Sequence, residues 1–424
     1  MGLGEVFRRF KDSVWQEFSF ITGNYRILVV SWMIMDIAME MPQPNFQYFV
    51  NDVLLGPPVA LGLIGFANFV AMAAVAFPGG YLADKYGRRW LVTTMTFAMS
   101  LSFLIFALAP SWHFVLIGSV VNSLCLIYQP ALFAMVQDSL PPERRGMGSS
   151  IIQLIHGTFN TPGPIIAGFL FFQFGLEWSM RLIYVIMTIL FFTAAVWRIR
   201  LRETMTNGEP IRFRYFISSY PSAVKESFAV WKVVPRTVLW LFSVRTLVMF
   251  GMALTNVINA LYAREVLGIP EEQWWLVFIP LLLTMVVASL PIGKLVDSVG
   301  RKIPIILGLG LFGVGTLIFA YGNFTTIMIS MSLYGLAMML VMSGVMALST
   351  DLIKPANRGK VMGFNNFFGY IMMGLGMLLG GLLYENFLPQ SPFLIGLGIN
   401  VVSLLMVLFL VQEPRRKVGV VLAE

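Results

Sequence analysis

The stretch GGYLADKYGRR at residues 79–89 places a glycine-rich turn, an aspartate and two arginines between two long apolar segments. A second stretch, IGKLVDSVGRK at residues 292–302, repeats its glycine, aspartate and basic positions at an offset of 213 residues. Self-similarity at a fixed spacing is typical of duplicated architectures. The pattern therefore predicts that the chain consists of two homologous halves.

The same offset relates more positions, without any gap between residues 80 and 168. It carries Gly80 onto Gly293, Asp84 onto Asp297, Gly87 onto Gly300, Arg88 onto Arg301, Asp138 onto Asp351, Gly163 onto Gly376 and Gly168 onto Gly381. Chance matches among loop residues would give a few of these pairs but not the whole ordered set. The duplication therefore extends well beyond the two loops.

The composition indicates an integral membrane protein. Of the 424 residues, 58% are hydrophobic and 12% are charged, whereas soluble domains have about 25% charged residues. Apolar runs long enough to cross a ~30 Å hydrocarbon core as helices recur along the chain. Twelve are expected, at residues 27–49, 59–82, 90–109, 113–137, 147–173, 179–198, 237–262, 273–295, 303–322, 325–350, 361–384 and 391–411.

The net charge of +8 reflects topology rather than nucleic-acid binding. If the N-terminus lies in the cytoplasm, most of the 29 Lys and Arg residues fall in cytoplasmic segments, as the positive-inside rule requires. Both termini are therefore expected inside. The polar segment 199–236 is the expected linker between an N-terminal six-helix bundle, residues 1–198, and a C-terminal one, residues 237–424.

Helix count, linker and both charged loops resemble the major facilitator superfamily over essentially the whole chain. The resemblance implies an all-α integral membrane protein, with twelve transmembrane helices in two pseudo-symmetric six-helix bundles. It also implies a central cavity that opens alternately to each side, with the substrate held near the midplane.

The resemblance further implies a conformational latch at the two loops. Asp84 would cap a helix N-terminus in the other half, and Arg88 would pair with Asp138 at the end of the fourth helix. Asp297, Arg301 and Asp351 could make the same contacts in the second half. The glycines that complete the two sets are Gly80, Gly87, Gly293 and Gly300. Alternatively, these residues are only cytoplasmic loop charges with tight glycine turns.

Two carboxylates lie one turn apart in the first predicted helix, in the stretch WMIMDIAME at residues 32–40. A charged side chain at the bilayer centre costs at least ~2.5–3.5 kcal/mol, so Asp36 and Glu40 must face water, a partner or a substrate. The repeat offset maps them onto Met249 and Ala253, so the second half lacks these charges. The acids are the predicted site of proton or cation binding.

Arg245 of the seventh helix is the expected counter-charge in the other half. It belongs either to the same functional site or to a static Asp36–Arg245 ion pair between the halves. Helical projection places other polar and methionine side chains on the faces expected to line the cavity. These are Gln43, Asn122, Gln129, Gln153, His156, Asn160, Met252, Asn256, Asn259, Met373 and Met377.

The fifth predicted helix carries HGTFNTPGPIIAG at residues 156–168, whose Gly163, Pro164 and Gly168 resemble the antiporter motif of drug:proton exchangers in the superfamily. The match is partial, because Ala167 replaces a glycine of that pattern. The fourth helix also lacks the arginine that such exchangers commonly carry. Glycine and proline in a membrane helix also serve packing or bending, which is the alternative interpretation.

Together these features favour a secondary active transporter that exports amphipathic or cationic small molecules by proton-coupled alternating access. Proton-linked uptake or facilitated transport of a sugar, organic acid or lipid-like solute is the alternative, and a non-transporting membrane sensor or scaffold is another. No catalytic constellation indicates an enzyme. We expect a multi-pass plasma-membrane protein that works as a monomer in the lipid bilayer on a small-molecule substrate, without nucleic acid.

No cofactor is expected, with the proton gradient as the energy source. The two histidines and the single cysteine, Cys125, cannot build a conventional His/Cys metal site, although Asp36 and Glu40 could supply oxygen ligands.

Overall fold

The structure is a computed structural model that describes residue 18 and residues 20–85, 87–141, 144–160, 162–205, 231 and 234–413. Within these, the side chains of residues 77–78, 80–85, 145–146, 149–150, 153, 157, 290, 297, 355–357 and 359–360 are not described. The described part of the chain is helical and contains no strand.

The N-terminal half contains α2 (Gly23–Met39), α3 (Phe46–Tyr48), η1 (Phe49–Val53), α4 (Pro58–Lys85), α5 (Arg88–Ala107), α6 (Trp112–Cys125), η2 (Leu126–Tyr128), α7 (Gln129–Asp138), α8 (Arg145–Phe159) and α9 (Pro162–Arg198). The C-terminal half contains α11 (Arg236–Asn256), α12 (Asn259–Glu265), α13 (Glu271–Trp274), η5 (Trp275–Val277), α14 (Phe278–Val299), α15 (Lys302–Tyr321), α16 (Phe324–Leu352), α17 (Pro355–Asn386) and α18 (Ser391–Leu410).

These helices account for all twelve expected membrane segments. Ten helices of the described residues are long and apolar enough to cross a membrane. One of them, α9, has 37 residues and bends at Gly175, where φ is 71°. Its two arms are the end of the fifth segment and the whole sixth segment. The first segment is α2, with 17 residues, continued by α3 and η1.

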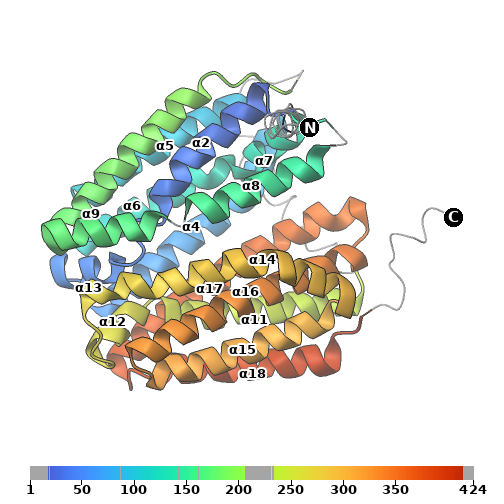
Figure 1. The fold of residues 1–424 in the computed structure, drawn as a ribbon. Coiled ribbons are helices and arrows are strands. Elements are labelled where there is room, and N and C mark those ends of the chain that lie inside the picture. Colours follow the sequence, from blue (N-terminus) through green and yellow to red (C-terminus); the bar gives the residue numbers. More distant parts are fainter. Residues whose placement is uncertain are drawn as a thin grey trace, which may run out of the picture.

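The two halves form separate bundles that diverge in one direction (Figure 1). α9 ends and α11 begins on the side where they diverge, which we call the linker side. On the opposite side, α12 and α13 of the C-terminal half lie against the N-terminal half. The conformation is therefore closed on the opposite side.

The buried hydrophobic side chains follow the same division. The largest cluster contains most of the N-terminal core together with Tyr262, Trp274 and Phe319 from the opposite side of the C-terminal half. A second cluster, around Leu241 and Val407, contains C-terminal residues alone. Among the described residues, the core that the halves share thus lies on the opposite side.

Glycines allow the two halves to approach closely at two contacts, which we call seams: one between α9 and Trp275, and one between α4 and α17. A Cβ on Gly168 of α9 would lie 2.5 Å from the ring of Trp275. A Cβ on Gly381 of α17 would lie 3.3 Å from the Cα of Gly62 in α4. The repeat offset carries Gly168 onto Gly381 and Gly62 onto Trp275. The two seams are therefore pseudo-symmetric equivalents, as expected of duplicated bundles.

Five segments that the sequence predicts as continuous helices are interrupted, and this corrects the expected boundaries. Breaks occur at residues 40–45, 126–128, 160, 257–258 and 275–277 of the first, fourth, fifth, seventh and eighth segments. Prolines explain the first three, because Pro42, Pro130 and Pro162 lack the amide that continues a helix. Broken backbone at membrane depth is tolerated where protein satisfies its polar groups.

The expected domain boundaries are compatible with the helix ends, since α9 ends at Arg198 and α11 begins at Arg236. Residues 206–230 and 232–233 of the expected linker lie outside the described residues. The exact domain boundaries and the extent of the linker therefore stay predictions.

We predict that Gly62→Val destabilises the seam between α4 and α17. The added Cβ would lie 2.8 Å from the backbone oxygen of Met377, and overpacking costs about 1–3 kcal/mol. The melting temperature of the purified protein should fall by several degrees. Gly310→Val is the matched control, because nothing lies within 4 Å of its Cβ position. Equal melting temperatures for the two variants would contradict the assigned packing.

Candidate functional site

The buried acid of helix α2 contacts a histidine of helix α8. Asp36 is 5% exposed, and its Oδ2 lies 2.8 Å from His156 Nδ1. Asp36 Oδ2 accepts no aligned hydrogen bond within the described residues, so the two side chains are close without meeting hydrogen-bond geometry. The His156 ring also packs edge-on against Trp32, with centroids 5.6 Å apart. The structure thus places a carboxylate and an imidazole together in the membrane.

A glycine of the fifth-helix motif lies at the start of α9, close to the end of α2. A Cβ on Gly163 would lie 3.0 Å from both Glu40 Cβ and Met41 N. Only glycine permits this approach, because the groups it would meet include backbone. Gly163 therefore holds the start of α9 against the break in the first segment, next to Glu40.

The equivalent contacts in the C-terminal half carry no charge. The offset maps Asp36 and His156 onto Met249 and Gly369, and a Cβ on Gly369 would lie 3.2 Å from Met249 Sδ. It maps Glu40 and Gly163 onto Ala253 and Gly376, and a Cβ on Gly376 would lie 2.9 Å from Ala253 Cβ. The scaffold is duplicated, but the ionisable groups occupy one half alone.

Arg245 lies in α11 and contacts its own half. Its Nη2 donates to Asn366 Oδ1 of α17 at 3.3 Å. Among the described contacts there is no ion pair between Arg245 and Asp36, which is instead next to His156. The offset maps Asn366 onto Gln153, one of the residues expected in the cavity, whose side chain lies outside the described residues.

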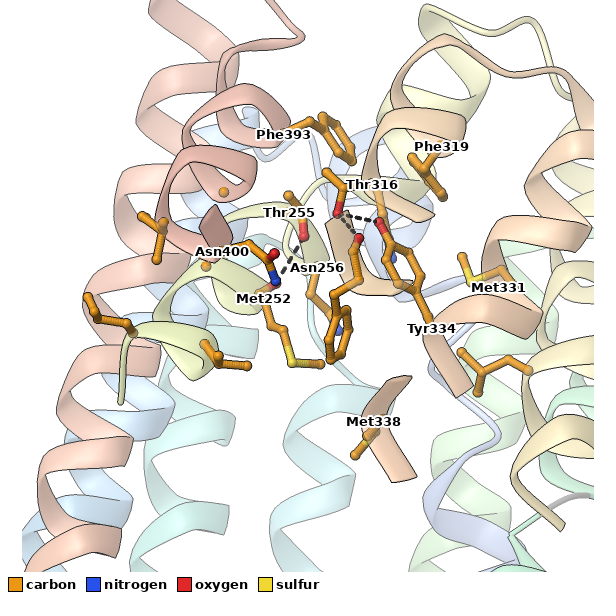
Figure 2. Close-up of a pocket in the computed structure, with 18 of the residues that line it drawn as sticks. Met252, Thr255, Asn256, Thr316, Phe319, Met331, Tyr334, Met338, Phe393 and Asn400 are labelled. Atoms are coloured by element: carbon orange, nitrogen blue, oxygen red, sulfur yellow. Dashed lines mark hydrogen bonds between the residues drawn. The ribbon is translucent and has the colours of Figure 1, made fainter. Parts of the chain in front are cut away.

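Two cavities contain five of the residues expected to line the pathway. The first, of about 160 Å³, lies inside the C-terminal bundle and includes Met252, Asn256 and Asn259 (Figure 2). The second, of about 290 Å³, lies beside the break of the first segment and includes Gln43 and Met377. Asn256 lines both, so the two cavities adjoin at this side chain.

Other expected cavity residues occupy different surroundings. Asn122 of α6 donates to Ser102 Oγ of α5 at 2.8 Å, within the N-terminal bundle. The 3₁₀ turn at Leu126–Tyr128 lies between Asn122 and Gln129 and changes their helical alignment. Gln129 and Met373 are half-buried. Asn160 ends α8, and its buried Oδ1 has no hydrogen-bond partner within the described residues.

The remaining residues of the helix 5 motif face the C-terminal half. Pro164 and Ile165 line a groove opposite Ile279 and Val286 of α14. Gly168 allows the approach of Trp275 described above. The motif thus contacts the acid-bearing helix at one end and the seam between the halves at the other.

The opposite side is closed by hydrogen bonds at the helix breaks. Gln47 Oε1 accepts from the backbone amide of Ala260 at 2.9 Å. Gln47 Nε2 donates to Asn256 O at 2.7 Å and to Asn259 Oδ1 at 2.8 Å. These bonds satisfy the break between α11 and α12, which has no proline. One glutamine therefore joins the halves where both helices are interrupted.

A charged contact lies farther out on this side. Arg264 Nη2 donates to Asp52 Oδ1 at 3.1 Å and to Asn51 Oδ1 at 3.2 Å. Burial alone lowers the pKa of Arg264, but its bonds to Asp52 and Glu271 raise it overall, so the guanidinium stays charged. The contacts crossing between the halves thus include an ion pair.

On the linker side, both charged loops make contacts within their own half. Arg88 pairs with Asp138, and Arg301 Nε lies 3.1 Å from Asp351 Oδ2.

Gly87 and Gly300 have φ values of 91° and 93°, which favour glycine. Gly80 and Asp84 lie in α4, and Gly293 and Asp297 in α14. The side chains of Asp84 and Asp297 lie outside the described residues, so the predicted cap on the facing half stays a prediction.

Sequence reasoning missed two carboxylates at these loops. Glu203 accepts from the backbone amides of Arg88 and Arg89 at 3.1 and 3.0 Å. Glu413 accepts from those of Arg301 and Lys302 at 2.7 and 3.3 Å. Each acid lies at the N-terminus of a helix, where orphan amides and the helix dipole favour negative charge. The acids are 210 residues apart, so the 213-residue offset does not relate them.

Arg198, at the end of the sixth expected segment, is not among the site residues predicted from the sequence. It is completely buried in the N-terminal bundle. Nε and Nη1 donate to Ser31 Oγ and Thr96 Oγ1 at 2.9 and 2.8 Å, and the guanidinium lies 5.7 Å from the ring centre of Tyr128. Its Nη2 has no partner within the described residues.

No group of three or more potential metal ligands occurs among the described residues. Asp36 and Glu40 lie one turn apart in the first segment, and His156 contacts Asp36.

Sequence comparison places the chain in a family. The model of the Major Facilitator Superfamily matches residues 28–282 and, in a second match, residues 241–423. The chain belongs to the Major Facilitator Superfamily. It is a multi-pass membrane transporter, and the twelve-segment fold expected from the sequence is confirmed.

Relatives within the superfamily include drug exporters. The chain is 24% identical to the multi-drug resistance efflux pump PmrA of Streptococcus pneumoniae, covering 87% of this chain and 91% of that one. It is 28% identical to the quinolone resistance protein NorA of Staphylococcus aureus over 40% of this chain and 44% of that one. The MFS-type transporter MJ1317 of Methanocaldococcus jannaschii is 24% identical, covering 92% and 95%.

Solved structures share the fold. The nucleoside transporter NupG superposes with a TM-score of 0.67 at 16% identity, covering 91% of this chain and 98% of that one. A bacterial homologue of the lysosomal transporter Spinster, in an inward-facing and occupied conformation, gives a TM-score of 0.71 at 14% identity, covering 93% and 96%. These likenesses establish the architecture and not the substrate.

We predict that Arg198→Met leaves the protein as stable or more stable. A buried charge without a counter-ion costs several kcal/mol, and Ser31 and Thr96 keep their bonds to Leu28 O and Val92 O. Arg181→Met is the control on the same helix, because Arg181 bonds Ala107 O and Ala109 O and pairs with Glu177. The melting temperature should fall for Arg181→Met alone. A larger fall for Arg198→Met would mean that Arg198 stabilises the bundle.

Proposed function

We propose that this transporter exports amphipathic or cationic small molecules in exchange for protons. The observation that carries the proposal is the cluster of Asp36, Glu40 and His156, which contains two acids and an imidazole between helices α2, α8 and α9. Ionisable groups inside a membrane are costly and mark ion or substrate paths. Their absence from the equivalent positions of the other half argues against a purely structural role.

The cluster could exchange a proton for a cation through the charge of its carboxylates. With both acids ionised, the site attracts a cationic substrate. Protonation removes negative charge and releases the cation. Each unit charge that crosses 100 mV of membrane potential involves about 2.3 kcal/mol, so neutralisation also eases reorientation. His156 is positioned to exchange a proton with Asp36 at the 2.8 Å contact.

Alternating access would use the two seams and the two charged loops. If the linker side is cytoplasmic, as the distribution of Lys and Arg favours, this conformation is open toward the cytoplasm. Opening to the outside requires the bonds of Gln47 and Arg264 between the halves to break. The linker-side ends would then meet, and Asp84 could act as the latch.

The relatives support export, since PmrA and NorA are named for multidrug efflux and quinolone resistance. We further propose that the protein lies in the plasma membrane with both termini in the cytoplasm and works as a monomer. The proton gradient would supply the energy without a resident cofactor.

We predict that Asp36→Asn combined with Glu40→Gln abolishes transport driven by a pH gradient. The measurement is efflux of a cationic dye from proteoliposomes, which should fall at least tenfold, because the variant has lost both carboxylates that bind the proton and the cation. Glu177→Gln is the control, since Glu177 is an exposed acid that pairs with Arg181 on α9.

Unchanged pH-driven efflux in the double variant would contradict the proposed mechanism. Concentrative uptake of a polar solute that does not depend on the acid pair would favour the alternative of proton-linked uptake.

A further inference from the structure

The cavity inside the C-terminal bundle has an aromatic wall. It lies between α11, α14, α15, α16 and α18, and Figure 2 shows side chains from several of these helices around it. Phe278, Phe312, Phe319, Tyr334 and Phe393 line it. Met252, Met331 and Met338 complete much of the wall. Aromatic rings and polarisable thioethers favour contact with another aromatic ring.

The hydroxyl groups of this wall are already satisfied by the protein. Tyr334 donates to Thr316 Oγ1 at 3.1 Å, and Thr316 donates to Phe312 O at 2.8 Å (Figure 2). Thr255 donates to Met252 O at 3.1 Å. Among the described residues, no charged side chain lines the cavity. The wall therefore offers an apolar surface, with amides contributed by Asn256, Asn259 and Asn400.

The size of the cavity fits one ring. Its volume is about 160 Å³, and an apolar cavity of about 150 Å³ in another protein binds benzene. An extended acyl chain would need a longer channel. A single aromatic ring is therefore the occupant that the volume and the wall favour.

The aromatic cavity adjoins the acid-bearing segment through one residue. Asn256 lines it and also the second cavity, whose wall includes Met39 and Gln43 of the first segment, whereas Glu40 lines neither cavity. A molecule at Asn256 would thus have an aromatic recess on one side and the broken, acid-bearing first segment on the other.

We propose that the C-terminal cavity is a subsite for an aromatic ring of the substrate, whose polar or cationic part lies at Asn256, beside the first segment. The substrate class is then the aromatic organic cation. The placement of the cation rests on the proposed function, whereas the ring subsite rests on the cavity alone.

Occupancy of this subsite would be transmitted to the contact that closes the opposite side. Asn256 and Asn259 line the cavity, and both accept hydrogen bonds from Gln47. A ring in the cavity would therefore contact Asn256 and Asn259, the two residues of the seventh segment to which Gln47 of the other half donates hydrogen bonds.

Equilibrium binding of radiolabelled tetraphenylphosphonium to the purified full-length protein in nanodiscs tests the subsite. Val248→Phe adds a ring to the cavity wall without introducing polarity. Val314→Phe makes the same change at an exposed position of α15 outside the cavity. Tetrabutylphosphonium, which has the same charge and no ring, is the matched ligand.

We expect Val248→Phe to weaken tetraphenylphosphonium binding at least tenfold, with Val314→Phe unchanged and tetrabutylphosphonium bound more weakly than tetraphenylphosphonium by the wild type. Equal affinity of Val248→Phe and wild type, or absence of tetraphenylphosphonium binding to the wild type, would overturn the subsite. The proposed function is judged separately: if the Asp36→Asn, Glu40→Gln variant still loses pH-driven efflux, export stands without the aromatic subsite.

Discussion

The contact between helix α2 and the α8–α9 pair is the constraint on which this account depends. Gly163 brings the fifth segment against the backbone at Glu40, and one turn away His156 lies against Asp36. In the other half the same positions are filled by Met249 with Gly369 and by Ala253 with Gly376. The duplication thus supplies a packing arrangement twice, and ionisable chemistry has been added to one copy. The charge cluster therefore makes the two halves chemically different at equivalent positions.

On the closed side, residues at equivalent positions of the two halves contact each other. Gln47 bonds Ala260, and Arg264 bonds Asn51. Each of these pairs is separated by the repeat offset of 213 residues. The first and seventh segments therefore cross near the pseudo-twofold axis, where each residue meets its own equivalent. The bonds of Gln47 both satisfy backbone groups at the break of the seventh segment and hold the halves together. A movement that breaks them must satisfy those groups in another way.

Much of the fold could be predicted from the sequence, because apolar length and a gapless repeat are local properties. The acid pair could be found for the same reason, since a carboxylate in an apolar run is conspicuous. The contact between Asp36 and His156 could not be predicted, because helical projection shows which face of its own helix a residue occupies but not which residue of another helix it contacts. Asn122 and Gln129 were aligned on an unbroken helix that the structure interrupts. Arg198 was placed with the loop cations, because nothing in the pattern reveals that a terminal arginine turns into the bundle.

The central claim is that the charge of Asp36 and Glu40 sets which side of the transporter is open. Double electron–electron resonance between spin labels on the linker side measures this directly. Trp90 and Ile303 are exposed, pseudo-equivalent positions on α5 and α15 for cysteine labelling in a Cys125→Ser background. The account predicts that the distance distribution of the otherwise unaltered protein changes between alkaline and acidic pH, while that of the Asp36→Asn, Glu40→Gln variant does not. The same pH response in both proteins, or none in either, would contradict it.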